Sequence, residues 1–291
     1  MFEKEILALS IEGDSVRAVQ TRGKQILRWG TRPLQPGWVQ DGQVHDLQEV
    51  GTAIDDLLLE EKFSRNRVVV GISGLRAISR VVTLPKMQSS LLPGAVTREA
   101  RREMPVPLDE IYLSWQVIRD RGTQQDVFVV GVPKELLDAS LQALQVAGLR
   151  PDAMDLKPMA LARLAGQSRA VVASFEVDCL ETAIVVDDVP AVMRAVAPVG
   201  ESQSAADRLS RMAEELASTI RFYNDSHKEA ALPADTPLYL TGAAAASPAL
   251  RETVEANFPY PIVSPDPPFR CPPEFPVALY AVNLGLAMKR V

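Results

Sequence analysis

The residues in this sequence whose types and spacing could do chemistry form a short pattern that occurs twice. Ser10 is followed by Glu12 and Gly13, and much later Ser174 is followed at the same spacing by Glu176. Each pattern stands at the end of a predicted strand, where the chain turns back. Hydroxyl groups and glycine N–H groups at such turns can hold phosphate, and an acidic residue can hold the water shell of a magnesium ion. We therefore expect two loops that face each other across a cleft.

The elements that must position these loops are also repeated. Strands are predicted at residues 6–11, 16–21 and 25–34, followed by a helix that Asp46 can cap and whose apolar residues lie between Leu47 and Leu58. The second copy has predicted strands at 170–176, 182–186 and 191–199, and then a long helix with an apolar stripe from Leu209 to Tyr223. A unit of three strands followed by a helix, present twice, indicates an internal duplication.

The stretch between the two copies predicts a small additional subdomain. A strand at 81–84, a helix around 97–103 and strands at 113–118 and 127–132 give a β-α-β-β order. We expect a first lobe over residues 1–168 with this subdomain inserted at about 80–133, and a second lobe over 169–276. A C-terminal helix over 277–291 is expected to return to the first lobe.

Composition excludes several classes of function. The chain has 291 residues, 47% of them hydrophobic and 23% charged, which is ordinary for a globular protein with two cores. A net charge of −6 gives no reason to expect nucleic acid as a partner. No apolar run approaches the ~18 residues that span a bilayer, and the charged start of the chain is unlike a signal peptide. Cys179 and Cys271 lack metal or redox spacing and are read as ordinary thiols in a reducing cytosol.

Several short motifs resemble those of the PilM family of type IV pilus assembly proteins, which are actin-like and related to the cell-division protein FtsA. Residues 8–19 are similar to the family's first phosphate loop, Asp-Ile-Gly-Ser-x-Ser-Val-Lys. Other segments resemble family motifs in the same order along the chain: residues 81–87, 99–105, 147–151 with Asp155, 215–223, 240–242 and 284–287. The resemblance covers essentially the whole chain. It implies an α/β, two-lobed actin-like fold of the duplicated ribonuclease H type.

The resemblance also implies a nucleotide cleft. ATP and magnesium would be its ligands, with Glu215 at the ribose and Thr241-Gly242 at the adenosine turn. The residues expected to line the cofactor site are Ser10, Glu12, Gly13, Ser15, Ser174, Glu176, Thr182, Gly200, Glu215, Thr241 and Gly242. An alternative for Glu215 is a solvated helix residue paired with Arg211 one turn earlier. No catalytic residue and no protein metal site are expected.

The sequence departs from the family at the positions that matter for chemistry. Ser10 stands where the family has the magnesium-directing Asp, and Glu12 and Glu176 stand where it has glycine. Two like charges ~4 Å apart cost roughly 4 kcal/mol at an effective dielectric near 20. Two such glutamates could cancel micromolar binding, which is worth about 8 kcal/mol. We therefore expect weakened or lost nucleotide binding and no ATP hydrolysis by the family's route. The glutamates could alternatively swing outward, or bind metal in place of the lost Asp.

The resemblance finally implies a partner, because PilM proteins hold the N-terminal tail of a membrane protein, PilN. The groove for this tail would lie between the first lobe and its inserted subdomain, with wall residues Leu84, Pro85, Arg101, Met104 and Pro105. The protein would then be cytoplasmic and peripheral to the inner face of the cytoplasmic membrane through its partner. The rival hypotheses are an active actin-like Mg-ATPase and the cytoplasmic part of a type II secretion platform protein. The proline-rich segment 259–276 is expected to be a stiff surface loop, with a ligand for a proline-recognising domain as the alternative.

Overall fold

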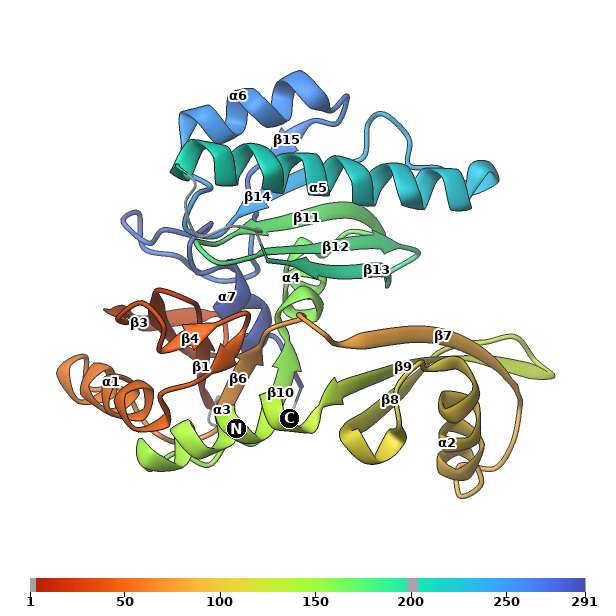
Figure 1. Cartoon of the computed structure of the whole chain (residues 1–291), viewed down its shortest axis with the longest axis horizontal. Helices are drawn as coiled ribbons and strands as arrows, with labels where there is room; N and C mark the ends of the chain where they lie inside the picture. The colour runs from red at the N-terminus through yellow and green to blue at the C-terminus, as the bar shows by residue number, and fades with distance from the viewer. Residues whose placement is uncertain (1–3, 198–203, 291) are drawn as a thin grey trace. The chain divides into compact units, whose positions relative to one another are not determined.

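The computed structural model describes residues 4–197 and 204–290, and two five-stranded sheets organise most of them (Figure 1). The first sheet has the strand order β10-β6-β1-β2-β3, and the second has the order β13-β12-β11-β14-β15. The strands of the first sheet are β1 (Glu5–Ile11), β2 (Ser15–Arg22), β3 (Gln25–Pro33), β6 (Val68–Ile72) and β10 (Ala153–Leu156). Those of the second are β11 (Arg169–Phe175), β12 (Leu180–Val186), β13 (Val189–Val196), β14 (Leu238–Thr241) and β15 (Ile262–Val263).

The two sheets have the same topology, which confirms the predicted duplication. In the first sheet, β1 pairs antiparallel with β2 and parallel with β6. In the second, β11 pairs antiparallel with β12 and parallel with β14. These sheets are the centres of the two lobes of the expected α/β fold.

Helices cover both faces of each sheet because the central strands are apolar without alternation. On the first sheet, α1 (Leu47–Glu60) and α3 (Lys134–Val146) supply residues to one core cluster with β1 and β6, and α7 (Ala281–Ala287) contacts β1, β2 and β6. On the second sheet, α5 (Ala205–Ser226) and α6 (Pro248–Asn257) cover one face and α4 (Lys157–Ala165) contacts the strands from the other (Figure 1). Helices α4 and α7 pack directly against each other.

Residues Arg76–Asp138 form a separate compact unit. It contains β7 (Ile78–Pro85), β8 (Ile111–Asp120) and β9 (Gln124–Pro133) in the order β7-β9-β8, with α2 (Leu92–Glu103) packed on one face. Its core includes Val82, Val96 and Val129. The sequence placed this subdomain at about 80–133. A two-stranded ribbon of β4 (Val39–Gln40) and β5 (Gln43–Val44) and two short 3₁₀ segments, Leu108–Glu110 and Lys228–Ala230, complete the elements.

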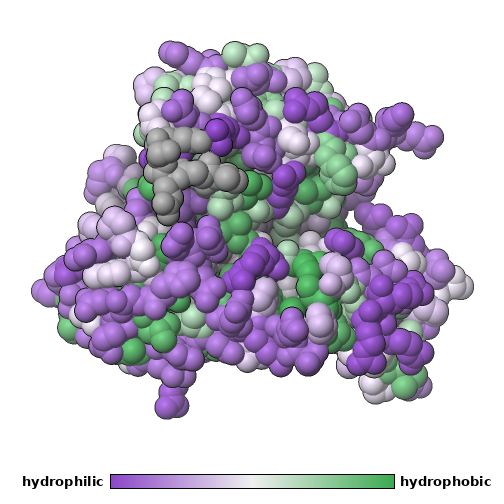
Figure 2. Space-filling model, in the orientation of Figure 1, coloured by the Kyte–Doolittle hydropathy of each residue, from purple (hydrophilic) through white to green (hydrophobic). Residues whose placement is uncertain are grey.

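The structure differs from the sequence expectation in two places. Helices α4 and α6 and the strands β4, β5, β10 and β15 have no counterpart among the predicted elements. The final helix spans only Ala281–Ala287, because residues 277–280 form a turn after Pro276. Within the proline-rich segment, the backbone of Arg270 bridges to Gln25 on β3, and Phe275 packs against Trp29 and Tyr280. Most of this segment is exposed or half-buried, as expected for a surface loop, but Phe275 is buried in the core beside the edge strand β3. The surface seen in Figure 2 is mostly hydrophilic, as the charged composition leads one to expect.

Candidate functional site

The two repeated motifs occupy equivalent positions at the ends of the central strands. Ser10 on β1 lies opposite Arg17 on β2 and next to Gly71 on β6. Ser174 on β11 lies opposite Glu181 on β12 and next to Thr241 on β14. Both serines are buried, and the loops that follow them converge, as predicted from the duplication. Arg17 and Glu181 are therefore related by the same duplication that relates the two serines.

An ion pair joins the two lobes at this point. Arg17 donates from Nη2 and Nη1 to the two carboxylate oxygens of Glu176, at 2.8 and 3.0 Å. It donates a third bond to the carbonyl oxygen of Leu279, at 3.3 Å. Both side chains of the pair are at most 3% exposed. Such a two-pronged contact is among the strongest and most directional that a carboxylate can make.

A second buried ion pair lies within the first lobe. Lys157, the first residue of α4, donates from Nζ to Glu12 Oε2 at 2.6 Å and to the carbonyl oxygen of Ile11 at 2.7 Å. Burial alone would raise the pKa of Glu12, but the charges of Lys157 and Arg17 hold it below its ordinary value. The outward swing considered for the two glutamates is therefore wrong, since Glu12 and Glu176 are 2% and 4% exposed.

A third glutamate, also from the second lobe, accepts hydrogen bonds from the first lobe. Glu181 accepts a hydrogen bond from Ser73 Oγ at 3.0 Å, and its two oxygens lie 3.1 and 3.2 Å from the backbone nitrogen of Gly74. Burial raises its pKa to about 7, against the attraction of Lys157. Burial and the charge of Glu12 also raise the pKa of Glu176. Burial would lower the pKa of Arg17, but the charge of Glu176 raises it above its ordinary value. We refer to Glu12, Arg17, Lys157, Glu176 and Glu181 as the crevice cluster.

The two loops also contact each other directly. A Cβ atom added to Gly13 would lie 2.3 Å from Asp178 Cγ, so a larger residue at position 13 would force the Asp178 side chain to move. Asn283 on α7 holds the two strands that flank the first loop. It donates hydrogen bonds to the carbonyl oxygens of Ala8 on β1 and Arg17 on β2, and its Oδ1 accepts from Ser10 Oγ at 3.4 Å. Side chains of the protein itself thus occupy the space between the two loops.

The remaining residues of the predicted cofactor site are distributed around this cluster. Ser15 Oγ bonds to its neighbour Asp14, and Thr241 Oγ1 bonds to the carbonyl oxygen of Ala173. Gly242 has a φ of 89°, in the left-handed region that favours glycine, and Glu176 Oε1 would lie 2.7 Å from an added Cβ. Thr182 is buried on the sheet face that α5 covers, opposite to the face of its neighbour Glu181, because side chains alternate along a strand. Gly200 lies outside the described residues.

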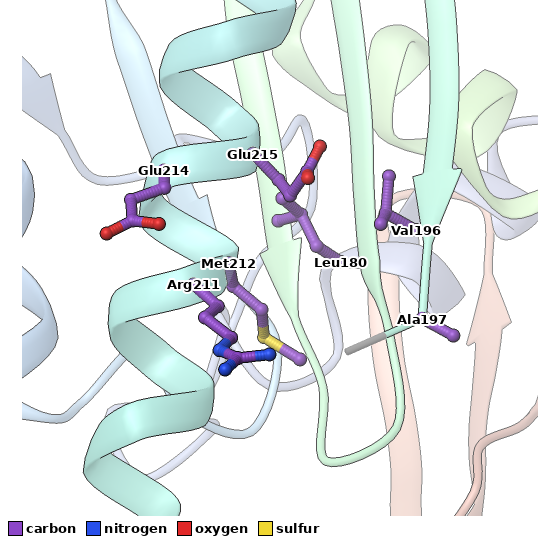
Figure 3. Close-up of a pocket in the computed structure, with 7 residues that line it drawn as sticks. All are labelled: Leu180, Val196, Ala197, Arg211, Met212, Glu214 and Glu215. Carbon is purple, nitrogen blue, oxygen red and sulfur yellow. The ribbon is translucent and has the colours of Figure 1, made fainter. Parts of the chain in front are cut away.

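Glu215 lines a cavity in the second lobe. The cavity measures about 360 Å³ and lies between α5 and the strands β12 and β13. Figure 3 shows Met212 and Glu215 on the side of α5 that faces the strands, whereas Glu214 points away from them. Glu215 forms an ion pair with Arg194 on β13, at 2.8 Å. A second cavity, of about 190 Å³, borders Met212, Glu176 and Ala243.

The crevice brings together many donors suited to an oxyanion. They are the side chains of Arg17 and Lys157, the hydroxyls of Ser73 and Ser174, and the backbone nitrogens of Gly74 and Ala243. All of these donors bond to Glu12, Glu176 or Glu181. A phosphate group therefore does not fit the crevice in this arrangement. The described residues also contain no cluster of three or more acidic, histidine or cysteine side chains able to hold a metal ion.

Three members of the cluster were not predicted as site residues. Arg17 stands within the segment that resembles a phosphate loop, and the register opposite Ser10 is the signal that could have identified it. Lys157 is a single charge in the otherwise apolar run Leu156 to Leu161. A lysine in such a run is almost never buried unless it is paired, so it indicates a partner. Glu181 could have been found by aligning the two hairpins of the duplication.

The predicted wall residues of the partner groove divide into two groups within the subdomain Arg76–Asp138. Leu84 and Met104 are 7% and 6% exposed and belong to the core of the subdomain. Pro85, Arg101 and Pro105 are exposed on its surface. The strands β7 and β8 are the two edges of the three-stranded sheet.

Comparison with known proteins places these features in context. The model of a family described as type IV pilus assembly protein PilM matches residues 9–211. A chain of a solved "PilM-PilN type IV pilus biogenesis complex" is 24% identical, with 98% of each chain covered and a TM-score of 0.80. The cytoplasmic domain of EpsL, an inner-membrane component of the type II secretion system of Vibrio cholerae, is 16% identical, with 98% of this chain and 94% of that chain covered and a TM-score of 0.52. A Bacteroides thetaiotaomicron protein with an actin-like ATPase fold and unknown function is 10% identical, with coverages of 99% and 97% and a TM-score of 0.50.

The expected two-lobed actin-like fold is therefore confirmed. In the part of the chain that the structure describes, every helix is too short or too polar to cross a membrane.

Proposed function

The chain belongs to the family of type IV pilus assembly protein PilM, and from this membership we propose that it is an actin-like scaffold of a pilus assembly platform. In this proposal it is cytoplasmic, holds the tail of a PilN-like membrane protein, and has weakened or lost nucleotide binding. The observation that carries the proposal is the family match over residues 9–211. That match includes the first lobe, the subdomain Arg76–Asp138 and the first hairpin of the second lobe.

The partner is proposed from the similarity to a chain solved in a PilM–PilN complex. We propose that the tail of the partner contacts the exposed residues Pro85, Arg101 and Pro105, while the buried Leu84 and Met104 hold them in position. Pro85 ends the edge strand β7, which has one side free of strand pairing in the subdomain sheet. An extended peptide gains affinity from backbone pairing at such an edge and from a few side-chain contacts.

The nucleotide part of the proposal rests on the crevice cluster. Glu176 is bonded to Arg17 through both oxygens, and Glu12 is bonded to Lys157. A triphosphate would have to displace both carboxylates from buried cations and then remain close to their negative charge. We propose that this competition weakens or abolishes ATP binding.

The test of the partner is direct binding of a peptide. A fluorescent peptide with the sequence of the N-terminal tail of the membrane protein encoded next to this chain is titrated with the full chain, and anisotropy is measured. We expect saturable binding that Arg101→Ala weakens about fivefold, as for loss of one contact to a charged group of about 1 kcal/mol. Arg251→Ala on α6 is the matched control, since Arg251 is also an exposed helical arginine. Absence of binding to such a tail would contradict the scaffold function.

One observation favours a second candidate, an active Mg-ATP-binding actin-like ATPase. The cavities beside Met212 remain open where Glu215 and Ala243 would meet a nucleoside. Saturable Mg-ATP binding with turnover in the unmodified chain would favour this candidate. The type II secretion alternative has only fold similarity to EpsL in its support, and the family match favours the pilus role.

A further inference from the structure

The crevice between the lobes is built as an oxyanion site. Its cations, Arg17 and Lys157, are 3% and 2% exposed, and both come from the first lobe. The backbone nitrogen of Gly74 on one side and that of Ala243 on the other point at carboxylate oxygens. Guanidinium, ammonium, hydroxyl and backbone N–H donors converging on one space are the donor set that proteins use for phosphate and carboxylate groups.

Most of this donor set is used by carboxylates of the same chain, and the two cations also bond to the carbonyl oxygens of Leu279 and Ile11. Glu176 takes both Nη atoms of Arg17 and also accepts from Ser174 Oγ at 3.2 Å and from the Ala243 nitrogen at 3.3 Å. Glu12 takes the Nζ of Lys157. Within each ion pair the two charges neutralise each other, so neither cation presents an unpaired charge to a ligand in this arrangement.

The duplication explains why a lysine completes the arrangement. Arg17 and Glu181 are equivalent in the two hairpins, as are Glu12 and Glu176. The contact of Arg17 with Glu176 therefore has a pseudo-symmetric counterpart between Glu181 and Glu12, in which both groups are acidic. Lys157 compensates this like-charge pair: it bonds to Glu12, and its charge also acts on Glu181.

We propose that the crevice is a latent polyphosphate site which Glu12 and Glu176 occupy as built-in ligands, so that the lobes are held closed without nucleotide. The proposal rests on the proposed loss of nucleotide binding and adds its cause. The two glutamates act as an autoinhibitory contact: they use the cations that an external phosphate would need. Removing both carboxylates takes the direct hydrogen-bonded carboxylate partner from each buried cation, while the bonds to the carbonyl oxygens of Leu279 and Ile11 remain. The cations then recruit an external polyanion.

The test uses the full-length chain and inorganic tripolyphosphate as the probe. Thermal unfolding of the wild type and of Glu12→Ala/Glu176→Ala is followed over a range of tripolyphosphate concentrations at constant ionic strength, with sodium chloride as the screening control. We expect the double variant to be stabilised progressively, with a dissociation constant at least about tenfold below that of the wild type. Adding Arg17→Ala to the double variant is expected to abolish this response.

A second variant keeps the test decisive if the alanine variant does not fold. Glu12→Gln/Glu176→Gln preserves side-chain volume and removes both negative charges, and it is expected to gain a weaker but saturable response to tripolyphosphate. Equal responses of wild type and variants, or a folded variant with no response, would overturn the proposal. Binding of the tail peptide to the wild type is measured in parallel. Absence of that binding would contradict the scaffold function but would leave the conclusion on the crevice unaffected.

Discussion

At the scale of single residues, burial and partners give three glutamates different acid–base properties. Burial would raise the pKa of Glu12, but the positive charges of Lys157 and Arg17 hold that pKa below its ordinary value. Glu181 is equally buried, but its direct partners are the neutral Ser73 hydroxyl and Gly74 N–H. Its pKa rises to about 7 because burial then dominates. Glu181 is therefore the member of the crevice cluster expected to titrate near neutral pH.

We predict that Glu181→Gln makes the protein less sensitive to rising pH. The pKa of Glu181 is about 7 in the fold and 4.5 in the reference state, so the folded chain binds more protons between these values and loses stability as pH rises through them. The full effect is about 3 kcal/mol and is present above pH 7. Urea unfolding at pH 5 and pH 8 should give a wild-type decrease that exceeds the decrease of the variant.

The same substitution at the exposed residue Glu214 is the control for the loss of one negative charge. Parallel pH profiles for wild type and Glu181→Gln would refute the assignment of this titration to Glu181.

At the scale of elements, the contact between α4 and α7 positions the crevice. Helix α4 begins with Lys157, and α7 carries Asn283, which bonds to the backbone of both β1 and β2. The two helices approach so closely that a Cβ atom at Gly285 would lie 2.0 Å from the carbonyl oxygen of Ala160. Arg163 reinforces the crossing by donating to the carbonyl oxygen of Gly285 at 2.7 Å. The glycine in the motif Leu284-Gly285-Leu286-Ala287 therefore has a packing reason.

We predict that Gly285→Ala destabilises the protein by at least about 2 kcal/mol, because a backbone atom of α4 cannot yield without separating the helices. Gly94→Ala in α2 is the matched control: an added Cβ at that position has open space around it, and alanine favours a helix by about 0.5–1 kcal/mol. Denaturant midpoints of the two variants should therefore move in opposite directions. A Gly285→Ala variant as stable as the wild type would contradict the close helix crossing.

At the scale of the whole molecule, the chain consists of two compact units with separate cores. The unit made of Met1–Leu75 and Ala139–Val291 holds both five-stranded sheets and the crevice cluster. The unit Arg76–Asp138 has its own core of residues from α2 and β7–β9. The two proposed roles follow these units. Closure of the lobes is proposed for the larger unit, and contacts with the partner are proposed for the unit Arg76–Asp138.

We predict that a cavity in the small unit loosens that unit selectively. Val96 on α2 is fully buried in its core, and Val96→Ala should cost about 2 kcal/mol through the lost burial and the cavity left behind. Hydrogen exchange should accelerate in α2 and β7–β9 and stay unchanged in β1, β6, β11 and β14. Uniform acceleration over the whole chain would show that the two units unfold as one.

The duplicated fold and the location of the cleft can be predicted from the amino-acid sequence alone. Strand patterns and the spacing of Ser10 and Ser174 from their glutamates are local properties, and both are visible without coordinates. The family resemblance rested on such local motifs for the same reason.

What fills the cleft depends on contacts that form when distant parts of the chain fold together. Local pattern cannot tell whether Glu12 and Glu176 repel a ligand, turn outward or find cations, because Lys157 and Arg17 reach them across 145 and 159 positions of sequence. Helix α4, which carries Lys157, has only nine residues, and this is too short for a helical repeat of apolar residues to be recognised in the sequence. Long-range ion pairing in a desolvated space is a property of the folded chain. It turned two expected repulsive charges into buried contacts, and the contact of Glu176 with Arg17 joins the two lobes.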